Sequence, residues 1–133
     1  MSRVVASRFN LSTVYVSQNG KRNDDFAAYI WKSEDYGQTW TDISGNIPAG
    51  SVNVIREDPR NPDVLYAGTD NAVFVTKDGG ENWQVLGDLP SSYVHDLIVH
   101  PRDNIIVVAT HGRGMWALDA SPVNATQRGR RFR

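Results

Sequence analysis

The sequence contains no cysteine and no long uninterrupted hydrophobic run. The absence of cysteine excludes disulfide bonds, thiolate nucleophiles and cysteine-based zinc sites. No run approaches the roughly 18 apolar residues that a membrane-spanning helix needs. The first ten residues, MSRVVASRFN, have no apolar segment of signal-peptide length. We therefore expect no membrane insertion, and the chain carries no visible signal peptide.

Neither sign of charge is in excess. The chain has 14 Lys and Arg against 15 Asp and Glu, for a net charge of -1. It therefore has no overall electrostatic attraction toward nucleic acid, and we expect no nucleic-acid partner. Hydrophobic residues make up 40% and charged residues 22% of the 133 residues, which is the composition of a globular domain with a core of its own.

What the sequence does contain is a repeat of about 42 residues in three copies. Aligning Pro59 with Pro101 places SVNVIREDPR (51–60) over YVHDLIVHPR (93–102), and an earlier copy begins with VVASRFN (4–10). Each copy consists of short β-branched and aromatic runs separated by Gly, Pro, Asn and Asp, which is typical of strands and turns. No segment has a convincing helical period. A repeat of this kind indicates one supersecondary unit used three times.

The expected strands are four per copy in the first two copies and three in the last. They lie at 4–8, 13–18, 28–33 and 39–43, then at 52–57, 63–68, 72–77 and 82–86, and finally at 94–99, 104–109 and 114–119. The run IIVVA in the third copy is apolar at every position, so we expect this strand to be covered on both faces. Stacked four-stranded antiparallel units of about 40–50 residues predict an all-β fold, an incomplete β-propeller. A β-sandwich does not predict the 42-residue repeat.

Two octapeptides mark the turn between the third and fourth strands. SEDYGQTW (33–40) and TKDGGENW (76–83) both read Ser/Thr-x-Asp-x-Gly-x-x-Trp. This pattern resembles the Asp-box, or BNR repeat, of sialidases, sortilin-type receptors and xyloglucanase-like glycosidases. The resemblance implies a β-propeller, and by family an extracellular or periplasmic location. It also implies that the boxes lie at the periphery, on the face away from the ligand.

We interpret the Asp-box residues as structural and assign no catalytic residue. A carboxylate in the turn can accept bonds from turn amides, glycine permits positive φ, and the tryptophan buries its ring in the next strand. A glycosidase needs two carboxylates about 5–9.5 Å apart, whereas each of these lies in its own turn. The third copy has Leu118 and Ala120 at the Thr and Asp positions. The structural set is Ser33, Asp35, Gly37, Trp40, Thr76, Asp78, Gly80 and Trp83.

The repeats predict blades at about 4–46, 50–88 and 93–119 in one partial propeller, 1–120, followed by an Arg-rich tail, 121–133. The last blade lacks a fourth strand. Propellers have four to eight blades, so open edges and uncovered faces remain. We therefore expect the chain to be completed by self-association, as a homo-oligomer, or by the remainder of a longer propeller.

The loops between second and third strands lie opposite the Asp-boxes and hold the candidate ligand-binding residues. The first loop carries an eight-residue insertion, NGKRNDDF (19–26), and the third contains HGRG (111–114). These side chains fit either a polar cluster for a sugar or an anionic group, or solvated loops. The candidates are Arg22, Asp24, Asp25, Asp70, His111 and Arg113. His95 and Asp96 are adjacent on a strand and point to opposite faces, so we predict neither a metal site nor a cofactor.

Together these features predict a non-catalytic binding or assembly module. Its open blade edges are the first candidate surface, and the loop face, for a possible glycan, is the second. The alternative is an enzyme: the terminal part of a sialidase-like or other glycoside hydrolase whose remaining catalytic residues lie elsewhere.

Overall fold

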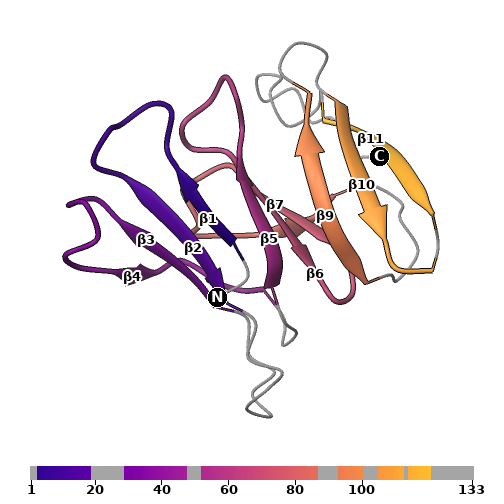
Figure 1. Cartoon of the computed structure of the whole chain (residues 1–133), viewed down its shortest axis with the longest axis horizontal. Helices are drawn as coiled ribbons and strands as arrows, with labels where there is room; N and C mark the ends of the chain where they lie inside the picture. Colours follow the sequence, from indigo (N-terminus) through magenta and orange to yellow (C-terminus); the bar gives the residue numbers. More distant parts are fainter. Residues whose placement is uncertain are drawn as a thin grey trace.

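The computed structural model describes residues 3–18, 29–47, 52–86, 93–100, 105–112 and 114–120. These residues form three antiparallel sheets arranged in a row (Figure 1). Among them no helix occurs, and so none that is long and apolar enough to span a membrane. The strands are β1 (Arg3–Ala6), β2 (Val14–Gln18), β3 (Tyr29–Ser33), β4 (Thr41–Asp42), β5 (Val52–Glu57), β6 (Leu65–Thr69), β7 (Val73–Thr76), β8 (Gln84–Val85), β9 (Val94–Val99), β10 (Ile105–Thr110) and β11 (Met115–Asp119).

Each sheet is one copy of the repeat. Blade 1 has the order β1-β2-β3-β4, blade 2 the order β5-β6-β7-β8, and blade 3 the order β11-β10-β9, with antiparallel pairing throughout. The all-β class and the four-stranded blades are thus confirmed, and the three sheets do not close into a ring. The fourth strands are shorter than expected, two residues each in β4 and β8, because the Asp-box turn extends to the tryptophan that precedes each of them.

The hydrophobic core lies between blades rather than within one of them. Between blades 1 and 2 it includes Tyr15, Ile30 and Ile43 on one side and Phe74 and Trp83 on the other. A second cluster joins blades 2 and 3. Blade 2 is therefore covered on both faces, and every residue of β6 and β7 is buried. Burial of both faces is what stacked blades require, since each sheet alone has no partner layer.

The expectation that the strand IIVVA is covered on both faces is wrong. In β10 buried and exposed positions alternate: Ile106 and Val108 are fully buried, whereas Ile105 and Val107 are more than a third exposed. The reason is position in the row. Blade 3 packs on blade 2 with one face only, and none of the described residues covers the other.

Blades 2 and 3 approach each other closely at Gly68. A Cβ atom at this position would lie 2.5 Å from Cγ1 of Val94 and 2.7 Å from Cγ1 of Val54. No side chain fits at such distances, so glycine is required for the two sheets to pack. The packing of blade 2 on blade 3 therefore depends on the close fit at Gly68 as well as on the burial of apolar side chains.

The blades present two different ends. At one end, backbone bonds join each Asp-box to the preceding hairpin, from Tyr36 N to Ser12 O (3.0 Å) and from Gly79 N to Asp63 O (3.0 Å). We call this the Asp-box end. At the opposite end the β10–β11 loop is joined to the segment before β9, from His111 N to Tyr93 O (2.9 Å). We call this the loop end.

Candidate functional site

The Asp-box of blade 2 uses its carboxylate inside its own turn. Asp78 accepts hydrogen bonds from Thr76 Oγ1 (2.7 Å), from Asn82 N (2.9 Å) and from Asn82 Nδ2 (3.1 Å). The Thr76 hydroxyl in turn accepts a bond from Gly80 N (3.0 Å). Loss of hydration would raise the pKa of Asp78, but the bonds from Thr76 and Asn82 outweigh it and the pKa is lowered. The carboxylate is held ionised by the turn.

The Asp-box of blade 1 repeats this arrangement. Asp35 accepts bonds from Thr39 Oγ1 (2.6 Å), Thr39 N (2.8 Å) and Ser33 Oγ (2.9 Å). These bonds, those from Thr39 first, lower the pKa of Asp35 to about 2. A carboxyl group with this pKa is a poor proton donor at neutral pH, because the catalytic pKa should lie near the working pH. The geometry gives neither aspartate the properties of a general acid.

A cleft of about 520 Å³ lies between the blades at the Asp-box end. It is lined mainly by charged groups, among them Lys32, Asp42, Asp63 and Glu81. Within the described part of the chain, however, no group of three His, Asp or Glu side chains is arranged to hold a metal ion. The described residues of this cleft therefore carry charge without forming a set of metal ligands.

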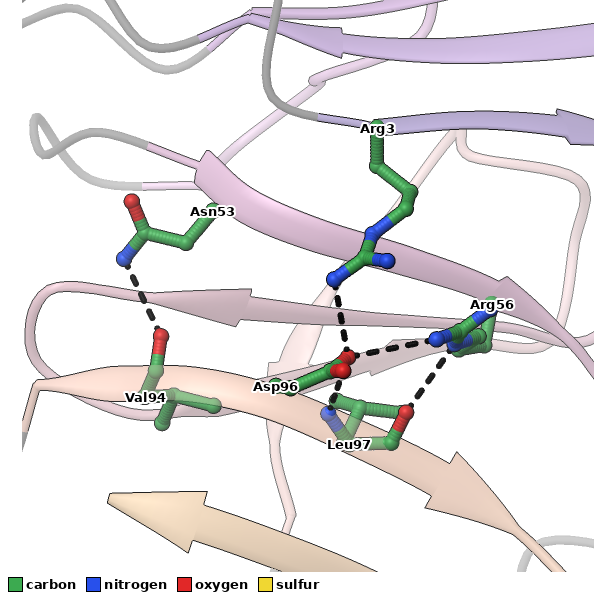
Figure 2. A network of polar contacts seen from close by, with 6 residues as sticks. All are labelled: Arg3, Asn53, Arg56, Val94, Asp96 and Leu97. Atoms are coloured by element: carbon green, nitrogen blue, oxygen red, sulfur yellow. Dashed lines mark hydrogen bonds and ion pairs between the residues drawn. The ribbon is translucent and has the colours of Figure 1, made fainter.

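The loop end brings together polar groups from blades 2 and 3. Asp70 accepts a hydrogen bond from Asn53 Nδ2 (3.0 Å), and the same amide donates to Val94 O on β9 (3.1 Å; Figure 2). Tyr93 Oη lies 3.5 Å from Asn53 Oδ1. The rings of Tyr93 and His111 meet edge to face, with centroids 6.0 Å apart. We call Asn53, Asp70, Tyr93 and His111 the loop-end cluster.

This cluster contains only part of the predicted candidate set. Asp70 and His111 lie at the loop end and are linked through Asn53 and Tyr93. The other four candidates, Arg22, Asp24, Asp25 and Arg113, lie outside the described residues, as does the tail 121–133. Sequence reasoning missed Asn53 and Tyr93. The available signal in the sequence was one asparagine inside the otherwise apolar run VNVI, and the structure shows that this side chain is 7% exposed.

A second polar network joins all three blades through strands β1, β5 and β9 (Figure 2). Asp96 Oδ1 lies 3.1 Å from Arg3 Nη2 and 3.2 Å from Arg56 Nη2, and it accepts a bond from Leu97 N (2.8 Å). Arg56 Nε also donates to Leu97 O (3.0 Å). All three charged side chains are about one-third exposed (31–35%), so solvent screens the ion pairs. The network ties β1 to β9 across blade 2, and sequence reasoning did not assign it.

Comparison with known proteins agrees with this architecture. Residues 28–126 match the Sortilin-Vps10 family, described as sortilin, neurotensin receptor 3. The chain is 33% identical over 84 residues to an oligoxyloglucan-reducing end-specific xyloglucanase of Emericella nidulans, and 31% identical over 91 residues to a probable enzyme of the same name from Neosartorya fischeri. These matches cover 58% and 63% of this chain. The chain spans only about a tenth (10% and 11%) of the two relatives.

Solved structures show the same fold. The GH74 enzyme of Niastella koreensis superposes with a TM-score of 0.71 at 17% identity, covering 92% of this chain and 20% of that one. An ancestral GH74 enzyme gives 0.69 at 20% identity, covering 84% of this chain and 14% of the other. At these identities the likeness extends to the fold and no further.

Proposed function

The chain belongs to the Sortilin-Vps10 family, and we propose that it binds a glycan at the loop-end cluster as a non-catalytic part of a β-propeller. The observation that carries this proposal is the meeting of two aromatic rings with an amide and a carboxylate at one blade junction. Rings offer flat apolar surface to a sugar, and a carboxylate such as that of Asp70 can accept hydrogen bonds from its hydroxyl groups. The buried Asn53 amide holds Asp70 in place against β9. Binding sites are built from such convergent polar groups beside apolar surface.

The curated relatives supply the class of ligand to test. Both are named xyloglucanases acting on oligoxyloglucan. We take xyloglucan-derived oligosaccharides as the ligand for this chain, with unsubstituted glucan chains as the comparison. The lowered pKa values of Asp35 and Asp78, and their hydrogen bonds within the turns, support assigning the Asp-box end to structure rather than to binding.

Isothermal titration calorimetry of the full chain with a xyloglucan oligosaccharide tests whether the loop-end cluster binds a glycan. Tyr93→Ala should weaken binding at least tenfold, because it removes the ring that packs against His111. Glu81→Gln, an exposed change at the Asp-box end, is the matched control and should leave the affinity unchanged. Equal affinity of the parent and Tyr93→Ala, or no binding by the parent, would contradict glycan binding at the loop-end cluster.

The names of the relatives also favour a second candidate, a contribution to glycoside hydrolysis. Its best acidic candidates within this sequence are Asp24 and Asp25, in the insertion of the first loop. A panel of fluorogenic glycosides and xyloglucan itself separates the two functions. Turnover by the full chain that is abolished by Asp24→Ala or Asp25→Ala would replace the binding function with catalysis.

A further inference from the structure

Blade 1 lies at one end of the row of sheets, so that one of its faces is turned away from blade 2 (Figure 1). Val16, Trp31 and Trp40 line a hollow of about 410 Å³ there, together with Gln18. Val4 on the same face is 55% exposed and Trp40 is 42% exposed. We call Val4, Val16, Trp31 and Trp40 the outer face of blade 1. Exposed apolar surface of this kind marks an interaction site.

The repeat shows what this surface is equivalent to. In blade 1 the register joins Val4 to Val16 and Val16 to Trp31. In blade 2 it joins Ile55 to Ala67 and Ala67 to Phe74. With the tryptophans of the two Asp-boxes, the equivalents of the outer face are Ile55, Ala67, Phe74 and Trp83. All four are buried, with exposures of 0%, 0%, 8% and 4%. The same positions are a buried interface in blade 2.

Blade 1 itself supplies the cover for these positions, and it does so with a specific clamp on Trp83. The indole Nε1 of Trp83 donates to Ile43 O (2.8 Å). The side chain of Asn46 accepts a bond from Trp83 N (2.6 Å) and donates to Trp83 O (3.0 Å). The carbonyl of Ile43 and the side chain of Asn46, three positions later in the segment that follows β4, therefore hold the Asp-box tryptophan of the next blade.

Trp40 has no such clamp within the described residues. Nothing there accepts a hydrogen bond from its indole N–H, and the residue is about ten times more exposed than Trp83 (42% against 4%). Yet it occupies the same place in an intact Asp-box whose internal bonds match those of the other turn. The outer face of blade 1 therefore has the composition of a face on which another blade packs.

We propose that the outer face of blade 1 docks a further propeller blade from outside this sequence, one that carries the Ile-x-x-Asn clamp directly after its last strand. A second copy of this chain does not provide it. In each copy the clamp of Ile43 and Asn46 is already engaged by Trp83. The equivalent positions after β8 are Leu86 and Leu89, so the asparagine is absent there. The proposal is independent of glycan binding.

A tandem protein tests this directly. Val52 is equivalent to Met1, because Val4 and Ile55 occupy equivalent register positions. Residues 1–51 can therefore be fused ahead of the full chain with a connection of natural length. The readout is hydrogen exchange at the Trp40 indole and backbone N–H groups, measured by NMR. Both should slow at least tenfold in the fusion, as for a tryptophan held by Ile43 and Asn46.

Two matched fusions isolate the clamp. Asn46→Ala in the extra copy alone should restore fast exchange of the Trp40 backbone N–H. The second fusion carries Trp31→Thr and Trp40→Thr in the extra copy. These changes remove the exposed rings of that copy and so guard against aggregation. Slow exchange of the Trp83 indole reports that each fusion is folded.

Three results would overturn the proposal. The first is fast exchange of Trp40 in a fusion whose Trp83 stays protected. The second is failure of both the plain and the Thr-substituted fusion to fold, since a compatible blade should lie stably on this face. The third is protection of Trp40 in the unmodified chain as its concentration rises, which would identify a second copy as the occupant.

Discussion

The two Asp-box turns are nearly identical in themselves and differ in what surrounds them. Each has an aspartate that accepts bonds from the hydroxyl two residues before it and from the backbone four residues after it. Trp83 is nevertheless 4% exposed and clamped by blade 1, whereas Trp40 is 42% exposed. The motif therefore fixes the turn, and the neighbouring blade decides how much the tryptophan contributes to stability.

Replacing each tryptophan in turn should give the largest difference in stability between the two turns. Trp83→Ala empties a buried site between blades and should lower the free energy of unfolding by about 3–5 kcal/mol. Trp40→Ala, at the partly exposed equivalent position, should cost about 1 kcal/mol or less. Urea unfolding of the two variants measures the difference. Equal losses would contradict the assignment of Trp83 as an anchor between blades.

The glycines of the two turns should differ for the same reason. Gly80 has φ of 104°, and a Cβ atom there would lie 2.7 Å from Cβ of Ile43 in blade 1. Gly37 has φ of 90°, but its nearest contact would be an ordinary 3.6 Å from the Trp40 ring. Gly80→Ala should cost about 3 kcal/mol, through strain plus overpacking, and Gly37→Ala about 1 kcal/mol, through strain alone. Thermal unfolding of both variants checks the order, and a larger effect at Gly37 would reverse the comparison.

The aspartates should matter less than the packing. Asp78→Ala leaves the Asn82 N–H and the Thr76 hydroxyl without their acceptor and should cost about 1–2 kcal/mol, since exposed groups regain water. Asp78→Asn keeps one acceptor oxygen and should lose less. Glycan affinity, measured at a temperature where both variants are folded, should equal that of the parent. Loss of binding without loss of stability would show that the box belongs to a ligand site.

The smallest expected effect is the pH response of the blade 1 turn. Its bonds to Thr39 and Ser33 lower the pKa of Asp35 from 3.8 to about 2. A carboxyl group with a lowered folded-state pKa stabilises the fold above its unfolded value. This contribution should therefore be complete above about pH 4 and disappear as the pH falls toward 2. NMR titration of the Asp35 carboxyl carbon measures the value directly, and a midpoint near 4 would contradict the hydrogen-bonded turn.

The fold could be predicted from the sequence because the repeat encodes it locally. The two boxes at residues 33–40 and 76–83, with β-branched runs between them, give the strand order without knowledge of any long-range contact. Burial could not be predicted in the same way. IIVVA in β10 is apolar at every position and LYAGT in β6 is not, yet β6 is buried throughout and β10 on one face only. The difference arises from position in the row of blades.

The candidate site could be predicted in location but not in composition. Connection order placed Asp70 and His111 at the loop end, because strand polarity alone determines which loops share an end. Asn53 and Tyr93 were not predicted, because their contacts depend on how β5 packs against β9. This packing brings the Asn53 side chain to Val94 O. The bond from Asn46 to Trp83 was missed for the same reason. Contacts between blades are set by packing that no single repeat reveals.

Chemical-shift mapping of the full chain with a xyloglucan oligosaccharide tests the division between the two ends most directly. Binding at the loop-end cluster should shift the signals of Tyr93, His111 and Asp70 and leave the amides around Asp35 and Asp78 unchanged. Shifts centred on the two Asp-box turns, with the loop end unaffected, would contradict it.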